Sequence, residues 1–218
     1  MDIVNNLSKE NVYLSLVNHE SYKDKLVDRP TRRFLDLNVV YSFWRPDSSN
    51  EDKWLDNSDM EYLGLKEEDL FEIALGNTMD AYPPKFARLE DIIKDMLSIS
   101  DDPLYDIEFS EDCKVPLYFF GNSSCINGSA VIMYHDILKR LSELFEEGFY
   151  ILPSSIHEYL IITESGIDRN EEYLLSMVKS VNRSVLTPDQ VLSDSVYHYC
   201  FKSNIISVIS SINLDANA

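Results

Sequence analysis

The sequence predicts an α+β fold, with a mixed, mainly antiparallel sheet and helices packed on it. Hydrophobic residues make up 44% of the 218 residues and charged residues 26%, so the chain can bury a core. Short apolar runs follow one another across short turns, and helical stripes separate only some of them. This order favours α+β over a doubly wound parallel sheet, in which strands and helices alternate.

The first hundred residues mix helical and strand-like patterns. Apolar pairs spaced four apart predict a helix over residues 8–27, with Ser8 as its N-cap and His19 on its surface. From Arg33 the period changes to two, which predicts one long half-buried strand to Phe43 and a returning strand over 53–57. Three helices should follow. They are expected at 59–63, at 67–75 and at 89–97.

The second half reads as strands joined by turns, with two helices inserted. An acidic, loop-like segment over 98–114 gives the one weak boundary in composition. We therefore expect an N-terminal helix/strand subdomain at 1–100 and a C-terminal α+β subdomain at 115–218, with one continuous domain as the alternative. Strands are expected at 115–120, 149–152, 159–163, 196–201 and 205–209, and helices at 134–145 and 170–181.

Net charge is the strongest signal in the composition. The chain has 38 acidic and 19 basic residues, for a net charge of −19. Binding to nucleic acid or to an anionic membrane depends on clustered Lys and Arg, and the basic cluster Arg29, Arg32 and Arg33 is interrupted by a proline. We expect neither direct nucleic-acid binding nor membrane binding. The charge is consistent with solubility or, alternatively, with mimicry of nucleic acid at a basic partner.

Cysteine and leader patterns indicate a cytoplasmic protein. Cys113, Cys125 and Cys200 are widely spaced and form no C-x-x-C pair, so reduced thiols are expected. The N-terminus lacks the basic region and apolar run of a signal peptide. No apolar stretch approaches the roughly 18 residues that a membrane span needs.

The candidate functional residues lie in the C-terminal third. Ser154, Ser155, His157 and Glu158 stand just before a predicted strand. A hydrolase would use Ser154 or Ser155 as nucleophile and His157 as base, oriented by Glu158 or Asp194. The structural alternative is that the serines satisfy backbone groups in a turn. Groups so close in sequence rarely reach triad geometry, and the G-x-S-x-G elbow is missing, which favours the structural interpretation.

Two further segments complete the candidate cluster with Asn182, Asp194, Ser195 and Tyr197. Asp194 and its serines can hydrogen-bond the backbone of a tight turn. Tyr197 and Tyr199 share one strand face and either form an exposed aromatic patch or pack against the helix at 170–181. The histidines lack the close spacing of zinc ligands, so neither a metal nor a cofactor is expected.

Several of these segments resemble the bacterial domain-of-unknown-function family numbered 5688. The likeness rests on Arg33–Leu37, Leu63–Asn77, Asn127-Gly128 with Tyr134, Leu152–Glu158, Val181–Arg183 and Val191–Tyr197. Members are typical of gut Firmicutes and usually carry a further helical N-terminal region, so the likeness implies a bacterial protein in a naturally short or truncated form. Ser129-Ala130 departs from the two alanines of many relatives. The family has no established activity, and the likeness implies none.

The leading hypothesis is a non-enzymatic cytoplasmic interaction or regulatory module whose partner is an unidentified protein or small molecule. A hydrolase is the first alternative, and it requires Ser154 or Ser155, His157 and Asp194 to converge. An acidic inhibitor that mimics nucleic acid is the second, and it requires two rows of carboxylates on one face.

Overall fold

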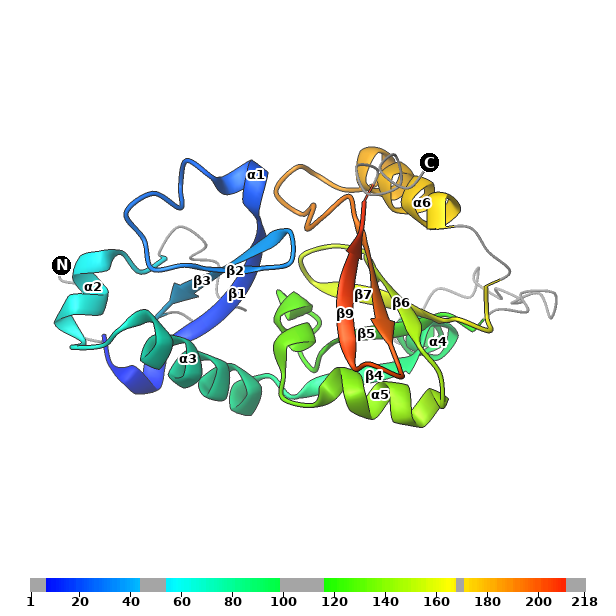
Figure 1. Ribbon diagram of the computed structural model, residues 1–218, viewed down its shortest axis with the longest axis horizontal. Helices are drawn as coiled ribbons and strands as arrows, with labels where there is room; N and C mark the ends of the chain where they lie inside the picture. The colour runs from blue at the N-terminus through cyan, green and yellow to red at the C-terminus, as the bar shows by residue number, and fades with distance from the viewer. Residues whose placement is uncertain (1–6, 44–53, 99–115, 168–170, 211–218) are drawn as a thin grey trace.

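Two antiparallel sheets, one in each half of the chain, organise the fold (Figure 1). The computed structural model describes residues 7–43, 54–98, 116–167 and 171–210. Every pairing between the described strands is antiparallel, and helices pack against both sheets. The predicted α+β class is therefore confirmed.

The first sheet has three strands in the order β1-β3-β2. They are β1 (Tyr13–Asn18), β2 (Arg32–Phe34) and β3 (Leu37–Ser42). Helix α3 (Glu67–Ala81) packs on β1, and the short helices α1 (His19–Tyr22) and α2 (Asn57–Tyr62) lie around the sheet (Figure 1). The α2 helix, which was predicted close to this position, begins at a capping box formed by Asp56 and Asp59.

The helix predicted over residues 8–27 is wrong. A short 3-10 helix precedes β1, and β1 pairs with β3 along its whole length. Both faces of β1 are buried: Leu14 and Leu16 belong to the main core, and Val17 packs in a small cluster with Leu26. A strand buried on both faces loses its alternation of apolar and polar residues, and its apolar spacing then resembles that of a helix.

The long strand predicted from Arg33 to Phe43 is a hairpin. Phe34 pairs with Leu37, so Leu35 and Asp36 form a two-residue turn between β2 and β3. Leu35 has φ 56°, a left-handed conformation that such turns usually give to Gly or Asn. Among the described residues, the predicted returning strand reduces to one bridge between Ser42 and Trp54.

The next elements follow the predictions with two differences. Helix α3 begins at residue 67 as expected but continues through Gly76 to Ala81, and α4 (Leu89–Ser98) confirms the third predicted helix. Strand β4 (Pro84–Arg88) was not predicted. Since β4 is an edge strand that begins at Pro84, the missing N–H is tolerated. Most of the acidic segment, residues 99–114, lies outside the described residues.

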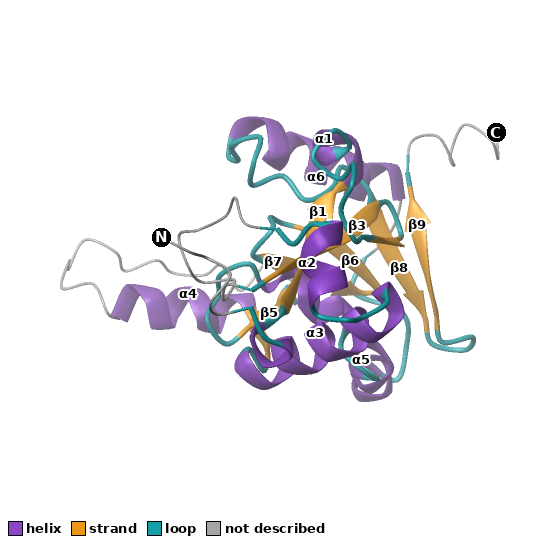
Figure 2. Ribbon diagram, turned by 90° about the vertical axis from the view of Figure 1, so that its left-hand side faces the viewer, coloured by secondary structure: helices purple, strands orange, loops and turns teal. Residues whose placement is uncertain are grey.

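The second sheet has six strands in the order β4-β5-β7-β6-β8-β9. One face packs against α6 (Glu171–Ser184), and the other packs against α5 (Ile137–Phe145) and the 3-10 helix η3 (Gly128–Met133), as Figure 2 shows for the two α-helices. Apart from β4 and η3, which were not predicted, these strands and helices lie close to their predicted positions. The remaining strands are β5 (Tyr118–Asn122), β6 (Phe149–Pro153), β7 (Glu158–Thr163), β8 (Val196–Cys200) and β9 (Ile205–Ile209).

The main core cluster draws on both halves of the chain. It contains Leu14 and Tyr41 from the first sheet, Val131 from η3, and Ile161 and Tyr197 from the second sheet. The two sheets therefore share buried surface, while the division into subdomains at 1–100 and 115–218 stays a prediction. No helix among the described residues is long and apolar enough to cross a bilayer.

Candidate functional site at the junction of the sheets

The turn between β2 and β3 reaches into the C-terminal half (Figure 1). At its tip, the half-buried Asp36 carboxylate accepts two hydrogen bonds, from Ser193 Oγ at 2.5 Å and from the Tyr197 hydroxyl at 2.7 Å. Ser193 and Tyr197 are fully buried. The two sheets are thus joined by one carboxylate and two neutral donors.

Burial and the Asp36 charge fix the protonation of two tyrosines beside this carboxylate. Burial raises the pKa of Tyr197 well above its ordinary value, and the negative charge of Asp36 raises it further. The same two causes raise the pKa of Tyr159, whose hydroxyl donates to the Ser129 carbonyl at 2.9 Å. Both hydroxyls therefore stay protonated and can act only as neutral donors to these oxygens near neutral pH.

Asn182 holds the loop that brings Ser193 to Asp36. Its side-chain amide, on α6, donates to the Ser193 carbonyl at 3.0 Å and to Asp194 Oδ1 at 2.7 Å. The backbone N–H of Ser195 donates to Ser193 Oγ at 2.9 Å. Four of the predicted residues, Asn182, Asp194, Ser195 and Tyr197, thus come together around Ser193. Sequence reasoning did not select Ser193 itself.

The other four predicted residues lie in the turn between β6 and β7. The backbone N–H groups of Ser154 and Ser155 both donate to the Glu158 carbonyl, at 3.2 Å each. Ser155 Oγ donates to Glu158 Oε1 at 2.9 Å and accepts the backbone N–H of His157 at 2.9 Å. The Ser155 hydroxyl is therefore used inside its own turn, as the structural interpretation predicted.

His157 links this turn to the loop before η3. Its Nδ1 accepts the backbone N–H of Asn127 at 2.9 Å, so the neutral ring carries its proton on Nε2. A base that activates serine through Nε2 needs the opposite tautomer, with Nδ1–H donating to a carboxylate. Within the described residues, no side-chain hydrogen bond or ion pair joins His157 to Asp194 or to Ser154.

Gly128 permits the close approach of these two loops. A Cβ atom at this position would lie 2.4 Å from the His157 carbonyl oxygen and 2.8 Å from the Asn122 nitrogen. The neighbouring Ser129 N–H donates to the Ile156 carbonyl at 3.2 Å. Only a residue without a side chain fits between two backbones at this distance.

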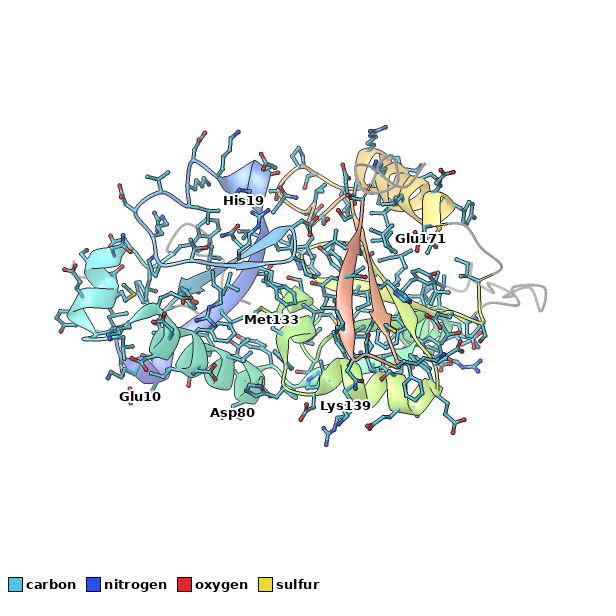
Figure 3. The ribbon with its side chains drawn as sticks, viewed as in Figure 1. Glu10, His19, Asp80, Met133, Lys139 and Glu171 are labelled. Atoms are coloured by element: carbon cyan, nitrogen blue, oxygen red, sulfur yellow. The ribbon has the colours of Figure 1, made fainter. Side chains whose placement is uncertain are left out.

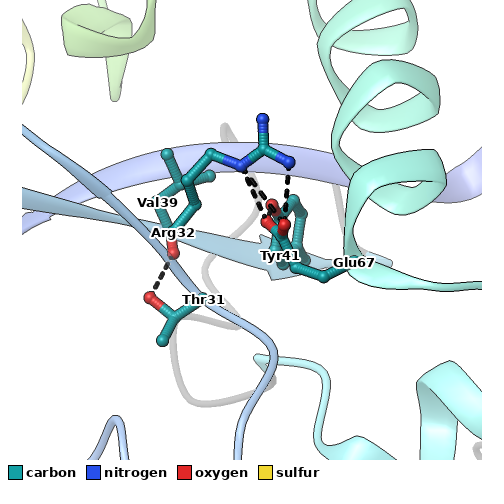
Figure 4. A network of polar contacts seen from close by, with 5 residues as sticks. All are labelled: Thr31, Arg32, Val39, Tyr41 and Glu67. Atoms are coloured by element: carbon teal, nitrogen blue, oxygen red, sulfur yellow. Dashed lines mark hydrogen bonds and ion pairs between the residues drawn. The ribbon is translucent and has the colours of Figure 1, made fainter.

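The hairpin that carries Asp36 is also fixed to α3. Arg32 donates to the Glu67 carboxylate from Nε at 3.2 Å and from Nη2 at 2.8 Å, and the Tyr41 hydroxyl donates to the same carboxylate (Figure 4). The Arg32 guanidinium lies 4.0 Å from the centroid of the Phe71 ring. The hydrogen bonds to Glu67 raise the pKa of Arg32, and burial raises the pKa of Tyr41. Asp36 therefore lies at the tip of a hairpin whose two strands are both hydrogen-bonded to Glu67 of α3.

The segments that carry the family likeness contact one another in two groups. Asp36, Asn182 and Ser193 come from three of these segments and meet at the junction. Asn127 and His157 come from two others and are bonded to each other. The signal that points to Asp36 in the sequence is a lone acid between Leu35 and Leu37 in one of those segments.

Tyr197 and Tyr199 take neither of the two predicted arrangements. Both are buried, so they form no exposed patch. Both belong to the core cluster shared with α5 and η3, on the sheet face away from α6. Tyr199 stacks on Phe149 of the neighbouring strand, with ring centroids 5.3 Å apart. Both tyrosines are therefore core residues.

In the described parts of the chain, no group of three or more His, Cys, Asp or Glu side chains could hold a metal ion. No curated protein and no solved structure matches the chain. The model of a family described as "Family of unknown function (DUF5688)" matches residues 4–200. Because this match covers most of the sequence, the chain belongs to the family of unknown function DUF5688.

Proposed function

We propose that this chain is a non-enzymatic interaction or regulatory module of the bacterial cytoplasm, with a protein or a small molecule as its partner. The proposal rests on the hydrogen bonds that the predicted site residues make. The Ser155 hydroxyl bonds within its own turn, and His157 Nδ1 accepts a backbone N–H. Groups that a hydrolase would use for chemistry instead hold loops together.

The hydrolase alternative is not supported by this geometry. A serine nucleophile needs its hydroxyl against an unprotonated imidazole nitrogen. Ser155 Oγ donates to Glu158 instead, and the neutral His157 ring carries its proton on the nitrogen that would have to accept. The nucleic-acid-mimicking alternative stays a prediction.

The junction also supports a regulatory role. Asp36, in the β2–β3 turn of the first sheet, accepts hydrogen bonds from Ser193, which lies just before β8, and from Tyr197, which lies in β8 of the second sheet. A partner that displaces the β2–β3 turn would leave the two buried hydroxyls without their acceptor. Binding at one sheet would therefore change the stability of contacts at the other.

Fluorophosphonate labelling of the full chain tests the non-enzymatic part of the proposal. Wild type and Ser155→Ala are treated side by side and digested for mass spectrometry. We expect no labelled serine in either protein. Labelling of Ser155 that disappears in the variant would show a reactive nucleophile and contradict the proposal.

Affinity capture from the native cytosol tests the regulatory part. Wild type and Asp36→Asn serve as baits at equal concentration, and Asp36→Asn keeps the shape of the turn while removing its charge. We expect a partner whose recovery changes several-fold between the two baits. Identical recoveries for every captured protein and ligand would count against a role for the junction.

A further inference from the structure

A directed chain of hydrogen bonds runs through the first sheet and ends at His19. Thr31 Oγ1 donates its proton to the Val39 carbonyl at 2.7 Å (Figure 4). Asn38 Nδ2 donates to Thr31 Oγ1 at 2.9 Å. Because Thr31 has already used its proton, it can only accept here, and the orientation of the Asn38 amide is fixed. Asn38 Oδ1 therefore points away from Thr31, as an acceptor.

Two basic side chains converge on that oxygen. His19 Nδ1 lies 2.7 Å from Asn38 Oδ1, and Arg33 Nη1 donates to the same atom at 3.2 Å. Since Oδ1 accepts, His19 Nδ1 carries the proton, and the neutral ring keeps its lone pair on Nε2. Asn38 is 5% exposed, whereas Arg33 is exposed and His19 is partly so, at the upper edge of the N-terminal half in Figure 3.

Arg33 is an exposed cation in a chain with a net charge of −19. Over the described ranges, no carboxylate lies within 4.0 Å of its guanidinium nitrogens. His19 Nε2 lies 3.8 Å from Glu20 Oε1, but Glu20 is 78% exposed and its other oxygen lies 3.9 Å from Lys23. Contacts of this exposed kind hold a side chain only weakly.

We propose that His19 and Arg33 bind a protonated tetrahedral oxyanion of the hydrogen phosphate type. The Arg33 guanidinium has five N–H donors in a fork that suits phosphate oxygens, and one of them is used by Asn38. The lone pair on His19 Nε2 accepts the remaining O–H of the anion. Asn38 is a positioning residue, because it fixes the tautomer of one ligand-binding side chain and the direction of the other.

The strongly negative chain does not prevent this binding. At physiological ionic strength the Debye length is about 8 Å, so only charges near the site act on the anion. Glu20 Oε1 lies 3.8 Å from His19 Nε2 and would repel an anion there, but the Glu20 side chain is 78% exposed and can turn toward Lys23. The Asp36 carboxylate is held by Ser193 and Tyr197.

NMR titration of the full chain with inorganic phosphate and with sulfate tests the proposal in mildly alkaline buffer, where an imidazole is uncharged. The two dianions share shape and charge, but only hydrogen phosphate has an O–H to donate to His19 Nε2. We expect saturable shifts at the His19 ring and the Arg33 side chain. Phosphate should bind about tenfold tighter than sulfate, the ratio that corresponds to one hydrogen bond of about 1.4 kcal/mol.

Two variants separate the roles of the side chains. His19→Asn keeps an N–H directed at Asn38 and removes Nε2, so phosphate and sulfate should bind equally. Arg33→Gln should weaken both anions about tenfold, since a hydrogen bond to a charged group is lost. Equal binding of both anions to wild type, or unchanged binding in Arg33→Gln, would overturn the proposal.

The tautomer of His19 provides a readout that does not depend on binding. Long-range proton–nitrogen spectra of the imidazole rings should show the proton on Nδ1 of His19 and on Nε2 of His157. A proton on Nε2 of His19 would remove the acceptor that hydrogen phosphate requires, and the proposal would fail even if anions bind.

Discussion

Two histidines of this chain use the same ring atom in opposite ways. His157 Nδ1 accepts a backbone N–H from Asn127, whereas His19 Nδ1 donates to the side chain of Asn38. The first leaves an N–H at Nε2 and the second leaves a lone pair. The partner of Nδ1 therefore decides whether Nε2 can donate or accept a hydrogen bond. The sequence analysis placed His157, and not His19, among the candidate residues, but His19 has the tautomer that a base or an acceptor needs.

The surroundings of the two histidines also differ: the polar groups around His157 bond to each other, whereas His19 and the neighbouring Arg33 lie at the surface. Around His157, the groups of Ser155, Glu158 and Gly128 are engaged with each other or packed against backbone. Around His19, a buried amide holds His19 and the exposed Arg33 at the surface. A closed network of this kind stabilises the fold, and an open one can bind a ligand. Stability measurements should therefore respond to the first region and binding measurements to the second.

Gly128→Ala should have the largest effect on the closed region. The added methyl group would meet two backbone atoms at 2.4 and 2.8 Å, and neither can move as a flexible side chain would. We expect a loss of about 3 kcal/mol in the free energy of unfolding, measured by urea denaturation. Gly76→Ala is the matched control, because Gly76 lies within α3 with no atom near its Cβ position. It should gain up to about 1 kcal/mol.

Asp36→Ala should be next. It leaves the hydroxyls of Ser193 and Tyr197 buried without their acceptor. A cost of about 2 to 3 kcal/mol is expected from urea denaturation. Asp36→Asn keeps one acceptor oxygen and should lose less. A cost for Asp36→Ala no larger than that of an exposed substitution would mean that the junction contributes little to stability.

Alkaline pH should weaken the same junction. Burial raises the pKa of Tyr159 and Tyr197, while in the unfolded chain a tyrosine ionises near pH 10. A raised folded pKa means that this stability is fully present below about pH 10 and falls as the pH rises above it. At about pH 10.5 the two tyrosines together should cost about 2 kcal/mol. The absorbance due to these two tyrosinates, taken as the difference between wild type and the Tyr159→Phe and Tyr197→Phe variants, should appear together with unfolding. Ionisation of either one ahead of unfolding would contradict the assignment.

The smallest effect is expected at His157, where two amides can replace one ring nitrogen each. His157→Asn places an oxygen near Nδ1 and can still accept the Asn127 N–H, whereas His157→Gln places its amide near Nε2. We expect Gln to cost about 1 kcal/mol more than Asn in thermal or urea unfolding. The reverse order would show that Nε2 is the nitrogen that matters.

Local patterns explain which elements could be predicted. The stripe in α4 and the turn before β9 depend on neighbours in sequence, and both are found where the pattern places them. The strand β1 was misread because its burial depends on α3 and on Leu26 on the other face, neither of which its own residues reveal. A two-residue turn with Leu35 at positive φ was also unpredictable, because leucine carries no turn signal.

The candidate site shows the same division. The segments around His157 and Asn182 could be selected because polar residues cluster near strand ends. The partner of Ser193 could not be selected, since Asp36 lies 157 residues away in the chain. Likewise, Asn38 and His19 are 19 residues apart and meet only because β1 and β3 are paired.

By itself, the sequence determined the α+β class, the position of most helices and strands, the acidic character and the family likeness, because these depend on composition and on local periodicity. Only the tertiary structure decided which carboxylate meets Ser193 and Tyr197, which nitrogen of each histidine carries the proton, and where Arg33 points. Hydrogen-bond direction depends on partners that the fold brings from distant positions, and no local pattern encodes it.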